Sequence, residues 1–435
     1  MSGDVVSVDV VGRSMRIDAV ELARRLGVPE PTAQQRAVIE APLRPALVVA
    51  GAGSGKTETM AARVAWLVAN GLVAPQDVLG LTFTRKAAAS LAERVGRRLH
   101  ALAEAGLGSP ASASASGAAG GADGGHDDFW ELPVVATYNS FASAFSREHA
   151  LAIGREPDAD VIGDAAAWQL ARRVVVEHGD ARLVRLEASV DRVATLVLGL
   201  SRTIADHVAD TETVRALAER FATIADLPYV PSGARAKSTP YASVTKAVAE
   251  VGALDPLLDL VIAYRDAKRR RGVVEFSDQV ALALQVCERS PEAVALARDR
   301  HRVILLDEYQ DTAVVQSRLL SALFRGAPVM AVGDPNQSIY GWRGASAANL
   351  GRFAEDFGGH DEAVPTYPLS TSWRNASRIL DAANVVAAPL RAASAVAVEA
   401  LEPRPGAPAG GIEVRFEETI ADEAAAVAAW CRDRL

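Results

Sequence analysis

A glycine-rich segment combines the residue types needed to hold a triphosphate: Ala50-Gly51-Ala52-Gly53-Ser54-Gly55-Lys56-Thr57. Its glycines let consecutive backbone N–H groups turn inward around phosphate oxygens. The Lys56 ammonium can reach the β and γ phosphates, and the Thr57 hydroxyl can bind Mg²⁺. The segment fits the pattern G-x-x-x-x-G-K-[ST], except that Ala50 stands at the first position. We therefore predict a P-loop that binds ATP and Mg²⁺ through residues 51–57.

An acidic pair, Asp307 and Glu308, supplies the second half of a site that would hydrolyse a nucleotide. Asp307 is predicted to hold Mg²⁺ through water, and Glu308 to polarise the water that attacks the γ-phosphate. Two adjacent carboxylates with separate tasks indicate hydrolysis rather than binding alone. Kinases and transporters also carry P-loops, so these residues predict ATP hydrolysis and leave its purpose open.

Short apolar runs precede both groups of residues and are predicted to be the strands that position them. Such runs occupy residues 46–49, 78–82, 303–306 and 329–332. Helical patterns follow at 56–70, at about 85–102 and after Thr312. Apolar strands that alternate with helices predict an α/β fold with a parallel sheet covered on both faces.

The remaining stretches divide into a helical region, a loop and a C-terminal segment. From about Ser143 to Arg271 helical periodicity replaces the strand signal, which predicts an all-helical domain inserted between strands of the sheet. Residues 106–125 carry almost no large side chain and predict a disordered surface loop, because they cannot repay their ordering entropy. A strand is expected at 412–416, followed by a helix from Ile420 to the last residue.

Length and composition suggest a folded soluble protein of about three domains, at roughly 150 residues each. The chain has 435 residues, of which 49% are hydrophobic and 23% charged, which excludes fibrous and disordered classes. Cys287 and Cys431 are too few for a disulfide framework or a four-ligand zinc site, so a reducing compartment is expected. No apolar run approaches the roughly 20 residues of a spanning helix, and no signal peptide is evident. We therefore expect a cytoplasmic protein without membrane contact.

The net charge is −8, from 46 basic and 54 acidic residues. A chain of this charge cannot bind nucleic acid over its whole surface, so any such contact must be a local groove. The basic run from Lys268 to Arg271 could belong to such a groove, but we favour a solvated helix end.

An ordered series of segments across nearly the whole chain resembles the motifs of UvrD/Rep/PcrA-type helicases of superfamily 1. The strongest signature is the pair Asp307-Glu308-Tyr309-Gln310-Asp311-Thr312 and Val332-Gly333-Asp334-Pro335-Asn336-Gln337-Ser338-Ile339-Tyr340-Gly341-Trp342-Arg343-Gly344-Ala345. The other segments are Gln35-Arg36-Ala37-Val38, Thr82-Phe83-Thr84-Arg85-Lys86-Ala87-Ala88-Ala89, Val135-Ala136-Thr137-Tyr138-Asn139-Ser140, Glu275-Phe276-Ser277-Asp278 and Leu369-Ser370-Thr371-Ser372-Trp373-Arg374-Asn375.

The resemblance implies further residues at the nucleotide. Gln35 would read the adenine edge, because its amide can both donate and accept. Arg374 would contact the γ-phosphate and stabilise charge as the bond breaks, the alternative being a surface arginine at a helix start. Trp373 replaces the family's tyrosine and could stack on adenine. Gln337 would couple the γ-phosphate to a DNA groove, with Arg343 also between the two sites.

The resemblance also places DNA contacts on three of the motifs. The predicted contacts are Phe83, Lys86, Thr137, Tyr138, Tyr340 and Trp342. A base stacked on an aromatic ring gains about 1–3 kcal/mol whatever its identity, which suits a protein that steps along any strand. Arg85 stands where the family usually has asparagine, and Tyr138 and Asn139 depart from the usual Phe-His pair. By residue type alone, Phe83 and Trp342 could also be core residues.

The domain division implied by the resemblance has three parts. Residues 1–142 and 272–375 would form a RecA-like ATP-binding domain, 143–271 a helical insertion, and 376–435 the truncated start of a second RecA-like domain. The implied function is an ATP-dependent 3′ to 5′ helicase on single-stranded DNA in repair or recombination, with ATP and Mg²⁺ as cofactors and duplex ends as partners. Because the closing arginine of the second domain is missing, we expect this N-terminal portion alone to hydrolyse ATP poorly.

Two alternative functions differ in class from a helicase motor. The DEYQDT wording and the Trp373-Arg374 pair look closest to actinobacterial members, which include subunits of a helicase and nuclease machine that processes DNA ends. A second subunit of that kind is therefore an expected partner, and a non-catalytic DNA-binding or assembly module is the first alternative. The intact Asp307-Glu308 pair argues against it for the complete protein, and for this N-terminal portion alone the alternative stays open. A P-loop transporter or kinase, the second alternative, leaves the segment from Gln337 to Trp342 unexplained.

Overall fold

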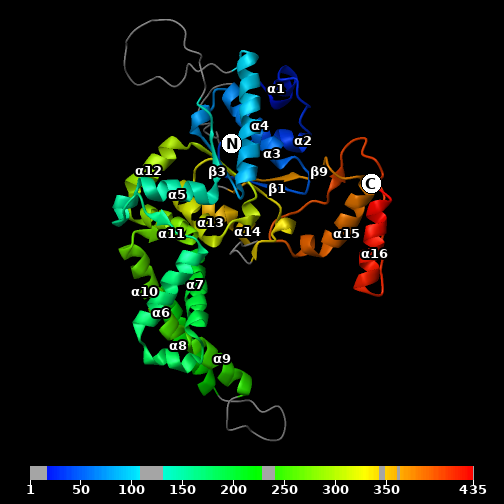
Figure 1. Ribbon diagram of the computed structural model, residues 1–435. Helices are drawn as coiled ribbons and strands as arrows, with labels where there is room; N and C mark the ends of the chain where they lie inside the picture. The colour runs from blue at the N-terminus through cyan, green and yellow to red at the C-terminus, as the bar shows by residue number, and fades with distance from the viewer. Residues whose placement is uncertain (1–16, 108–130, 228–240, 342–347, 360–362, 435) are drawn as a thin grey trace, which may run out of the picture.

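A parallel six-stranded sheet lies at the centre of the molecule (Figure 1). The computed structural model describes residues 17–107, 131–227, 241–341, 348–359 and 363–434. The strand order is β3-β2-β6-β7-β1-β8, and every neighbouring pair is parallel. The strands are β1 (Ala46–Ala50), β2 (Val78–Thr82), β3 (Val134–Thr137), β6 (Val303–Leu306), β7 (Val329–Gly333) and β8 (Thr366–Leu369). The predicted α/β fold is confirmed, including the four strands expected from apolar runs.

Helices cover both faces of this sheet, because its inner strands are apolar on both sides. Ile304 and Leu306 pack into one core cluster, whereas Val303 and Leu305 pack into the other. One face is covered by α1 (Ala19–Arg25), α2 (Ala33–Ile39), α3 (Lys56–Ala69) and α4 (Arg85–Glu104). The other is covered by α5 (Tyr138–Glu148), α11 (Phe276–Arg289), α12 (Pro291–Arg300), α13 (Val314–Phe324) and α14 (Ala348–Phe357). Short 3-10 turns are η1 (Pro75–Asp77), η2 (Ala150–Ile153), η3 (Ala181–Leu186), η4 (Thr223–Asp226), η5 (Tyr309–Asp311) and η6 (Pro335–Gln337).

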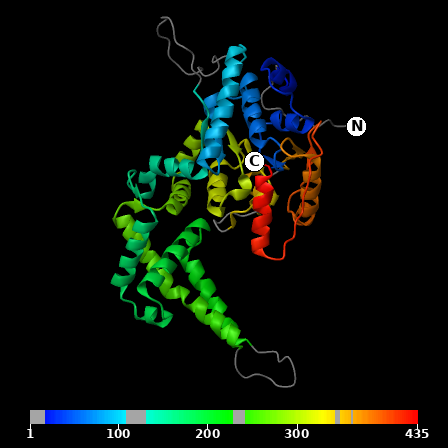
Figure 2. The same ribbon diagram turned by 45° about the vertical axis from the view of Figure 1, so that its right-hand side comes forward.

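The helical region forms an arm that leaves the sheet in both views (Figures 1 and 2). Its helices are α6 (Asp164–His178), α7 (Val190–Asp206), α8 (Thr211–Ala222), α9 (Ala242–Gly252) and α10 (Leu254–Arg270). Leu170, Val197 and Leu258 belong to a separate core cluster built on α6, α7 and α10. At its base, β4 (Asp160–Val161) pairs in parallel with β5 (Val273–Val274), so the chain enters and leaves the arm side by side.

The join between the arm and the sheet contains a buried ion cluster. Lys268 lies in the last turn of α10, within the basic run predicted to be a solvated helix end, yet its side chain is only 4% exposed. Its Nζ donates to Glu275 Oε2 at 2.9 Å and to Asp278 Oδ2 at 2.6 Å. The hydroxyl of Tyr264 also donates to Glu275 Oε2, at 3.0 Å. The run does end a helix, but the prediction of solvation is wrong for Lys268.

The C-terminal segment carries two helices and a small pair of strands. The helices are α15 (Ser377–Ala393) and α16 (Ile420–Arg432), and β9 (Thr371–Ser372) pairs with β10 (Glu402–Pro403). The strand predicted at 412–416 is wrong: its residues pair with no described strand, and the Phe416 side chain is 99% exposed. Alternating apolar residues form a strand only beside a partner strand. Apart from its first two residues, the loop predicted at 106–125 lies outside the described residues. Within the described ranges, no helix is long and apolar enough to cross a membrane.

Candidate nucleotide site and adjoining groove

The predicted P-loop joins the end of β1 to the start of α3, as a phosphate loop must. Gly53 and Gly55 have φ values of +75° and +83°, in the left-handed region that favours glycine. A Cβ on Gly53 would lie 2.9 Å from Arg374 Cβ, and one on Gly55 would lie 3.1 Å from Gln35 Nε2. Trp373 N–H donates to the carbonyl of Gly53 at 2.9 Å. The loop is therefore packed against both segments predicted to hold the nucleotide.

Lys56 meets the acidic pair although 252 positions separate it from Glu308. Its Nζ donates to Glu308 Oε2 at 3.0 Å. The two residues follow β1 and β6, which lie two strand spacings apart with β7 between them, about 10 Å. Long side chains from one edge of a parallel sheet can bridge that gap. Glu308 has a φ of +50°, a strained conformation for a residue with a Cβ, as is often found at functional sites.

Asp307 is a buried carboxylate beside this ion pair. Its Oδ1 accepts the Glu308 backbone N–H at 3.0 Å. Burial, and then the neighbouring Glu308 charge, raise the pKa of Asp307 to about 6, while Lys56 acts against the rise. A cation would compensate this buried charge, and the carboxylate of Asp307 and the hydroxyl of Thr57 are the oxygen ligands that Mg²⁺ prefers. These residues fit the predicted metal.

A pocket of about 360 Å³ opens above the P-loop. Lys56, Thr57, Glu308 and Arg374 line it together, whereas Asp307 and Gln337 are not among its described lining residues. Its complete described lining is Gly53, Ser54, Gly55, Lys56, Thr57, Glu58, Arg94, Glu308, Trp373 and Arg374. Within the described part of the chain, Ser54 Oγ is buried without a hydrogen-bond partner, which fits a polar group whose partner would be a bound phosphate.

A second cavity, of about 330 Å³, adjoins the first and has mainly apolar walls. Gln35 and Trp373, both predicted to contact adenine, line it together with Gly55. Gln35 Oε1 accepts the Thr32 N–H at 3.0 Å in a helix capping box, which fixes the position of its amide. Trp373 is 42% exposed and so remains available for stacking. Arg98 was not predicted here; it pairs with Glu58 at the rim.

A groove of about 690 Å³ runs between the sheet edge and the base of the helical arm. Phe83 lines it and stacks on Tyr340, with ring centroids 4.9 Å apart and planes inclined by 27°. Thr137 also lines the groove, although its hydroxyl caps α5 by accepting the Ser140 N–H. Lys86 is exposed but is not among the described lining residues, whereas Arg85 is. The predicted contact Trp342 and the neighbouring Arg343 lie outside the described residues.

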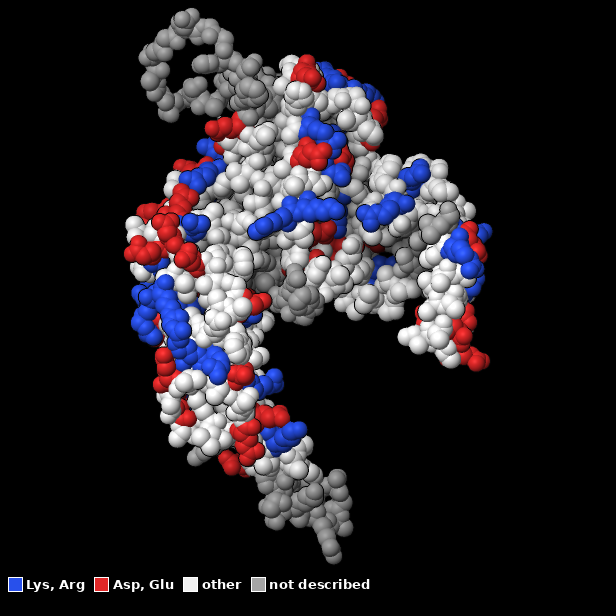
Figure 3. Space-filling view, in the orientation of Figure 1, with Lys and Arg blue, Asp and Glu red and all other residues white. Residues whose placement is uncertain are grey.

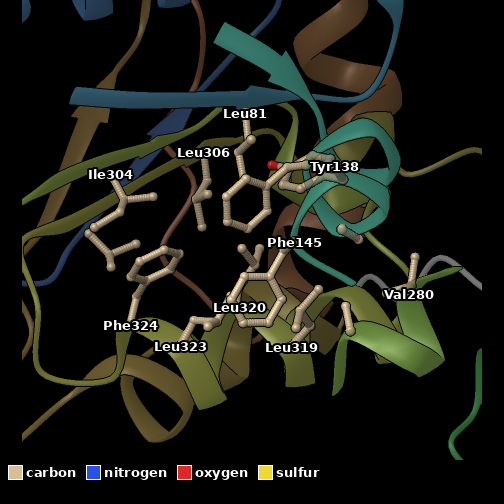
Figure 4. Packing of buried hydrophobic residues seen from close by; sticks show 14 of the residues in the cluster. Leu81, Tyr138, Phe145, Val280, Ile304, Leu306, Leu319, Leu320, Leu323 and Phe324 are labelled. Carbon is tan, nitrogen blue, oxygen red and sulfur yellow. The ribbon is translucent and has the colours of Figure 1, made fainter. Parts of the chain in front are cut away.

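The Tyr138 ring lies inside the protein core, so the predicted base contact is wrong for this residue. Its exposed fraction is 3%, and its hydroxyl donates to the Asp307 carbonyl at 2.8 Å. Figure 4 shows the ring among Leu81, Leu306 and Phe145. Burial also raises its pKa. A ring enclosed in this way cannot stack on a base, and it instead supports the strand end that carries Asp307.

Phe276 was not predicted as a contact, yet it lies in the groove wall with 58% of its surface exposed. It begins α11, and its neighbours Glu275, Ser277 and Asp278 are polar. A large ring in a polar helix start was the available signal, because a core position would normally have apolar neighbours at helical spacing. Arg147 lines the same groove.

Charges on the visible face are mixed rather than uniformly basic. Figure 3 shows Lys and Arg in separate groups, with Asp and Glu between many of them. This distribution agrees with the net charge of −8 and with a nucleic-acid contact restricted to a local groove.

Comparison with known proteins identifies similar sequences over most of the chain. The family model for the UvrD/REP helicase N-terminal domain matches residues 31–358. DNA helicase II of Haemophilus influenzae is 26% identical over 81% of the chain and 39% of its own length. ATP-dependent DNA helicase PcrA of Leuconostoc citreum is 28% identical over 79% and 37%, and ATP-dependent DNA helicase UvrD2 of Mycobacterium tuberculosis is 30% identical over 82% and 43%. The chain thus spans about two fifths of the length of these relatives.

Proposed function

The chain belongs to the UvrD/REP helicase family, and from this premise we propose that it is the ATP-binding part of a DNA helicase that moves 3′ to 5′ along single-stranded DNA. The observation that carries this proposal is the contact of Lys56 Nζ with Glu308 Oε2 at 3.0 Å, because it unites the phosphate-binding and hydrolytic residues beside an aromatic groove. The relatives are named DNA helicases, which agrees with DNA as the substrate.

The proposed nucleotide site uses both pockets. Adenine lies between Gln35 and Trp373, and the phosphates lie on the P-loop N–H groups and Lys56. Thr57 and Asp307 would hold Mg²⁺, which when bound would neutralise charge on the phosphate oxygens. Glu308 accepts a proton from the attacking water. Arg374 stabilises the charge that develops on the γ-phosphate, since a planar guanidinium suits phosphate oxygens.

The proposed DNA strand occupies the groove between the sheet edge and the arm. Phe83, Tyr340 and Phe276 offer rings for base stacking, and Arg85 and Arg147 offer charge for phosphates. Stacking is indifferent to base identity, which suits a translocating protein. The contacts predicted for Lys86, Thr137 and Trp342 remain proposals.

We retain the three-part division as a proposal: residues 1–142 and 272–375 for the ATP-binding domain, 143–271 for the helical arm, and 376–435 for the start of a second RecA-like domain. The separate core cluster of the arm supports its autonomy. A second helicase–nuclease subunit, duplex ends as substrate, a role in repair and a cytoplasmic location are further proposals from the family resemblance.

The test of this function is Glu308→Gln in the full-length protein. The amide cannot accept the proton of the attacking water, so DNA-stimulated ATP turnover should fall by about 10²–10⁴-fold. ATP affinity, measured by equilibrium titration, should change by less than about threefold, because Lys56 still holds the phosphates. The control is Glu355→Gln, an exposed glutamate on α14, which should leave turnover unchanged. Undiminished turnover in Glu308→Gln would contradict the assignment.

A further inference from the structure

Gln310 lies between the candidate hydrolytic residue and the loop that leads to the groove. It belongs to η5, two positions after Glu308, and is only 1% exposed. The β7 strand ends beside it, and the loop from Asp334 to Gln337 follows. Gln310 is not among the described lining residues of either nucleotide pocket or of the groove. Its contacts therefore serve other residues rather than a ligand.

The amide of Gln310 is used at both ends. Its Nε2 donates to Glu308 Oε2 at 2.9 Å and lies 3.3 Å from Asp311 Oδ2. Its Oε1 accepts the backbone N–H of Asp334 at 3.0 Å. A carboxylate only accepts and a backbone N–H only donates, so these partners fix which end of the amide is oxygen. The position therefore requires an amide side chain, since one end donates to Glu308 and the other accepts from Asp334.

Glu308 and Asp334, the partners of Gln310, each accept a further hydrogen bond from another predicted site residue. Glu308 Oε2 also accepts from Lys56 Nζ at 3.0 Å. Asp334 Oδ2 accepts from Gln337 Nε2 at 2.6 Å. A chain of hydrogen bonds thus connects Lys56, Glu308, Gln310, Asp334 and Gln337, and we call it the relay.

The packing around the relay leaves Gln310 little freedom. A Cβ on Gly333 would lie 2.8 Å from Gln310 Oε1, so the end of β7 approaches closely because it has no side chain there. Ser338 Oγ donates to the Gln310 carbonyl at 3.3 Å. Gln310 is therefore held tightly between Glu308 and the loop after β7.

We propose that Gln310 is a positioning residue that holds Glu308 and couples the nucleotide site to the groove. When Lys56 transfers its contact from Glu308 to a phosphate, Glu308 Oε2 keeps its hydrogen bond from Gln310. The position of Glu308 then fixes the Asp334–Gln337 loop, from which the chain continues to Tyr340 in its stack on Phe83. This inference rests on the proposed function, since it requires that the chain bind both ATP and single-stranded DNA.

The experiment measures how strongly the two ligands influence each other in Gln310→Glu and Gln310→Leu. Gln310→Glu keeps the length and the acceptor for Asp334 N–H but cannot donate to Glu308 when ionised. Gln310→Leu removes both groups without adding charge. The affinity for a fluorescent oligothymidylate is titrated with and without Mg²⁺ and a non-hydrolysable ATP analogue, at a temperature where circular dichroism shows each variant folded. In the wild type the analogue should change DNA affinity by about 5–150-fold. In both variants that change should shrink to less than about twofold, while the affinity for each ligand alone stays within about threefold.

Gln285→Glu and Gln285→Leu are matched controls. Gln285 is exposed on α11, so these substitutions make the same chemical changes outside the relay. They should retain the wild-type coupling. Full coupling in folded Gln310 variants would overturn the inference and leave the proposed function intact. A wild-type chain that binds neither ligand would instead contradict the proposed function. A purely structural role for Gln310 would lower stability and both affinities together, and so would also overturn the inference.

Discussion

At the scale of single residues, Asp307 carries an electrostatic cost that its proposed metal would relieve. Its folded pKa of about 6 lies above the ordinary value of 3.8, chiefly because of burial. Between about pH 4 and pH 6 the folded chain therefore binds more protons than the unfolded chain, so stability falls as pH rises through that window. The shift corresponds to about 3 kcal/mol once the carboxylate is fully ionised. The metal-free chain should be less stable above this window because of this one group.

Asp307→Asn should therefore stabilise the metal-free chain at about pH 8, by about 1–3 kcal/mol, and have little effect near pH 4. Asparagine keeps the oxygen that accepts the Glu308 N–H but removes the charge. Urea unfolding at both pH values measures the difference. Asp158→Asn, at an exposed position, is the control and should change stability at neither pH. An equal effect of Asp307→Asn at both pH values would exclude the buried charge as its cause.

Tyr138 gives a second prediction at this scale, because its ring supports the site from inside the core. Tyr138→Leu should lower the free energy of unfolding by about 2–4 kcal/mol, through the lost hydrogen bond to Asp307 and lost packing. Its affinity for single-stranded DNA, measured where the variant is folded, should stay within about twofold. Phe83→Leu is the comparison: it removes a groove ring and should weaken DNA binding by about 5–100-fold. Similar losses of DNA affinity in both variants would return Tyr138 to the DNA contacts.

A site residue could be predicted from the sequence where its position depends mainly on residues close to it in the chain. Lys56 and Glu308 stand in short motifs that directly follow apolar strands, so their place at the sheet edge could be predicted. Their side chains are in contact there. Gln35 and Trp373, which the family resemblance assigns to the nucleotide, line one cavity. Tyr138 and Phe276 could not be assigned in this way, because the exposure of an aromatic ring depends on which distant helices pack around it. The same applies to the amide of Gln310, whose partners come from two different strand ends.

At the scale of elements, the strands and helices that could be predicted are those with an apolar run bounded by turn or capping residues. The P-loop glycines and a buried run define β1 and α3, and alternate residues of β6 face opposite cores. The segment 412–416 has the alternating pattern of a strand but lacks a described neighbour to pair with. The local pattern therefore predicted a strand correctly where a neighbouring strand was present to pair with it. It predicted wrongly at 412–416, where no described strand lies beside the segment.

Gly53 provides the prediction for an element, since the P-loop and the segment after β8 pack together only if this residue has no side chain. Gly53→Ala should lower ATP affinity by about tenfold or more, because its Cβ would lie 2.9 Å from Arg374 Cβ and push that segment away. Gly71→Ala is the matched control: Gly71 also has a positive φ, of +64°, but open space around it. Both variants should lose about 1–2 kcal/mol of stability from backbone strain. Equal ATP affinities, measured by titration, would show that the contact with Arg374 is unimportant.

At the scale of the whole molecule, the helical arm and the sheet must keep a fixed relation, because the groove is built from both. Asp206 at the end of α7 and Phe276 at the start of α11 line it together with Thr137 of the sheet edge. The arm has its own core, so its internal packing does not by itself fix that relation. The buried cluster around Lys268 links the two, since Lys268 lies in the last turn of α10 and its carboxylate partners Glu275 and Asp278 lie at the start of α11 in the sheet domain.

Lys268→Met should therefore be costly, because it leaves two carboxylates near each other without their buried cation. Removal of one partner from a buried ion cluster costs about 3–5 kcal/mol, and urea unfolding should show a loss of this size. Arg202, which also contacts Glu275, moderates the loss but lies further into solvent. At a temperature where the variant is folded, single-stranded DNA should bind about 3–10-fold more weakly, since the groove walls are no longer held together. Lys246→Met, at an exposed position on α9, should change stability by less than about 0.5 kcal/mol and DNA affinity not at all. A loss below about 1 kcal/mol in Lys268→Met would mean that the join is held by apolar packing instead.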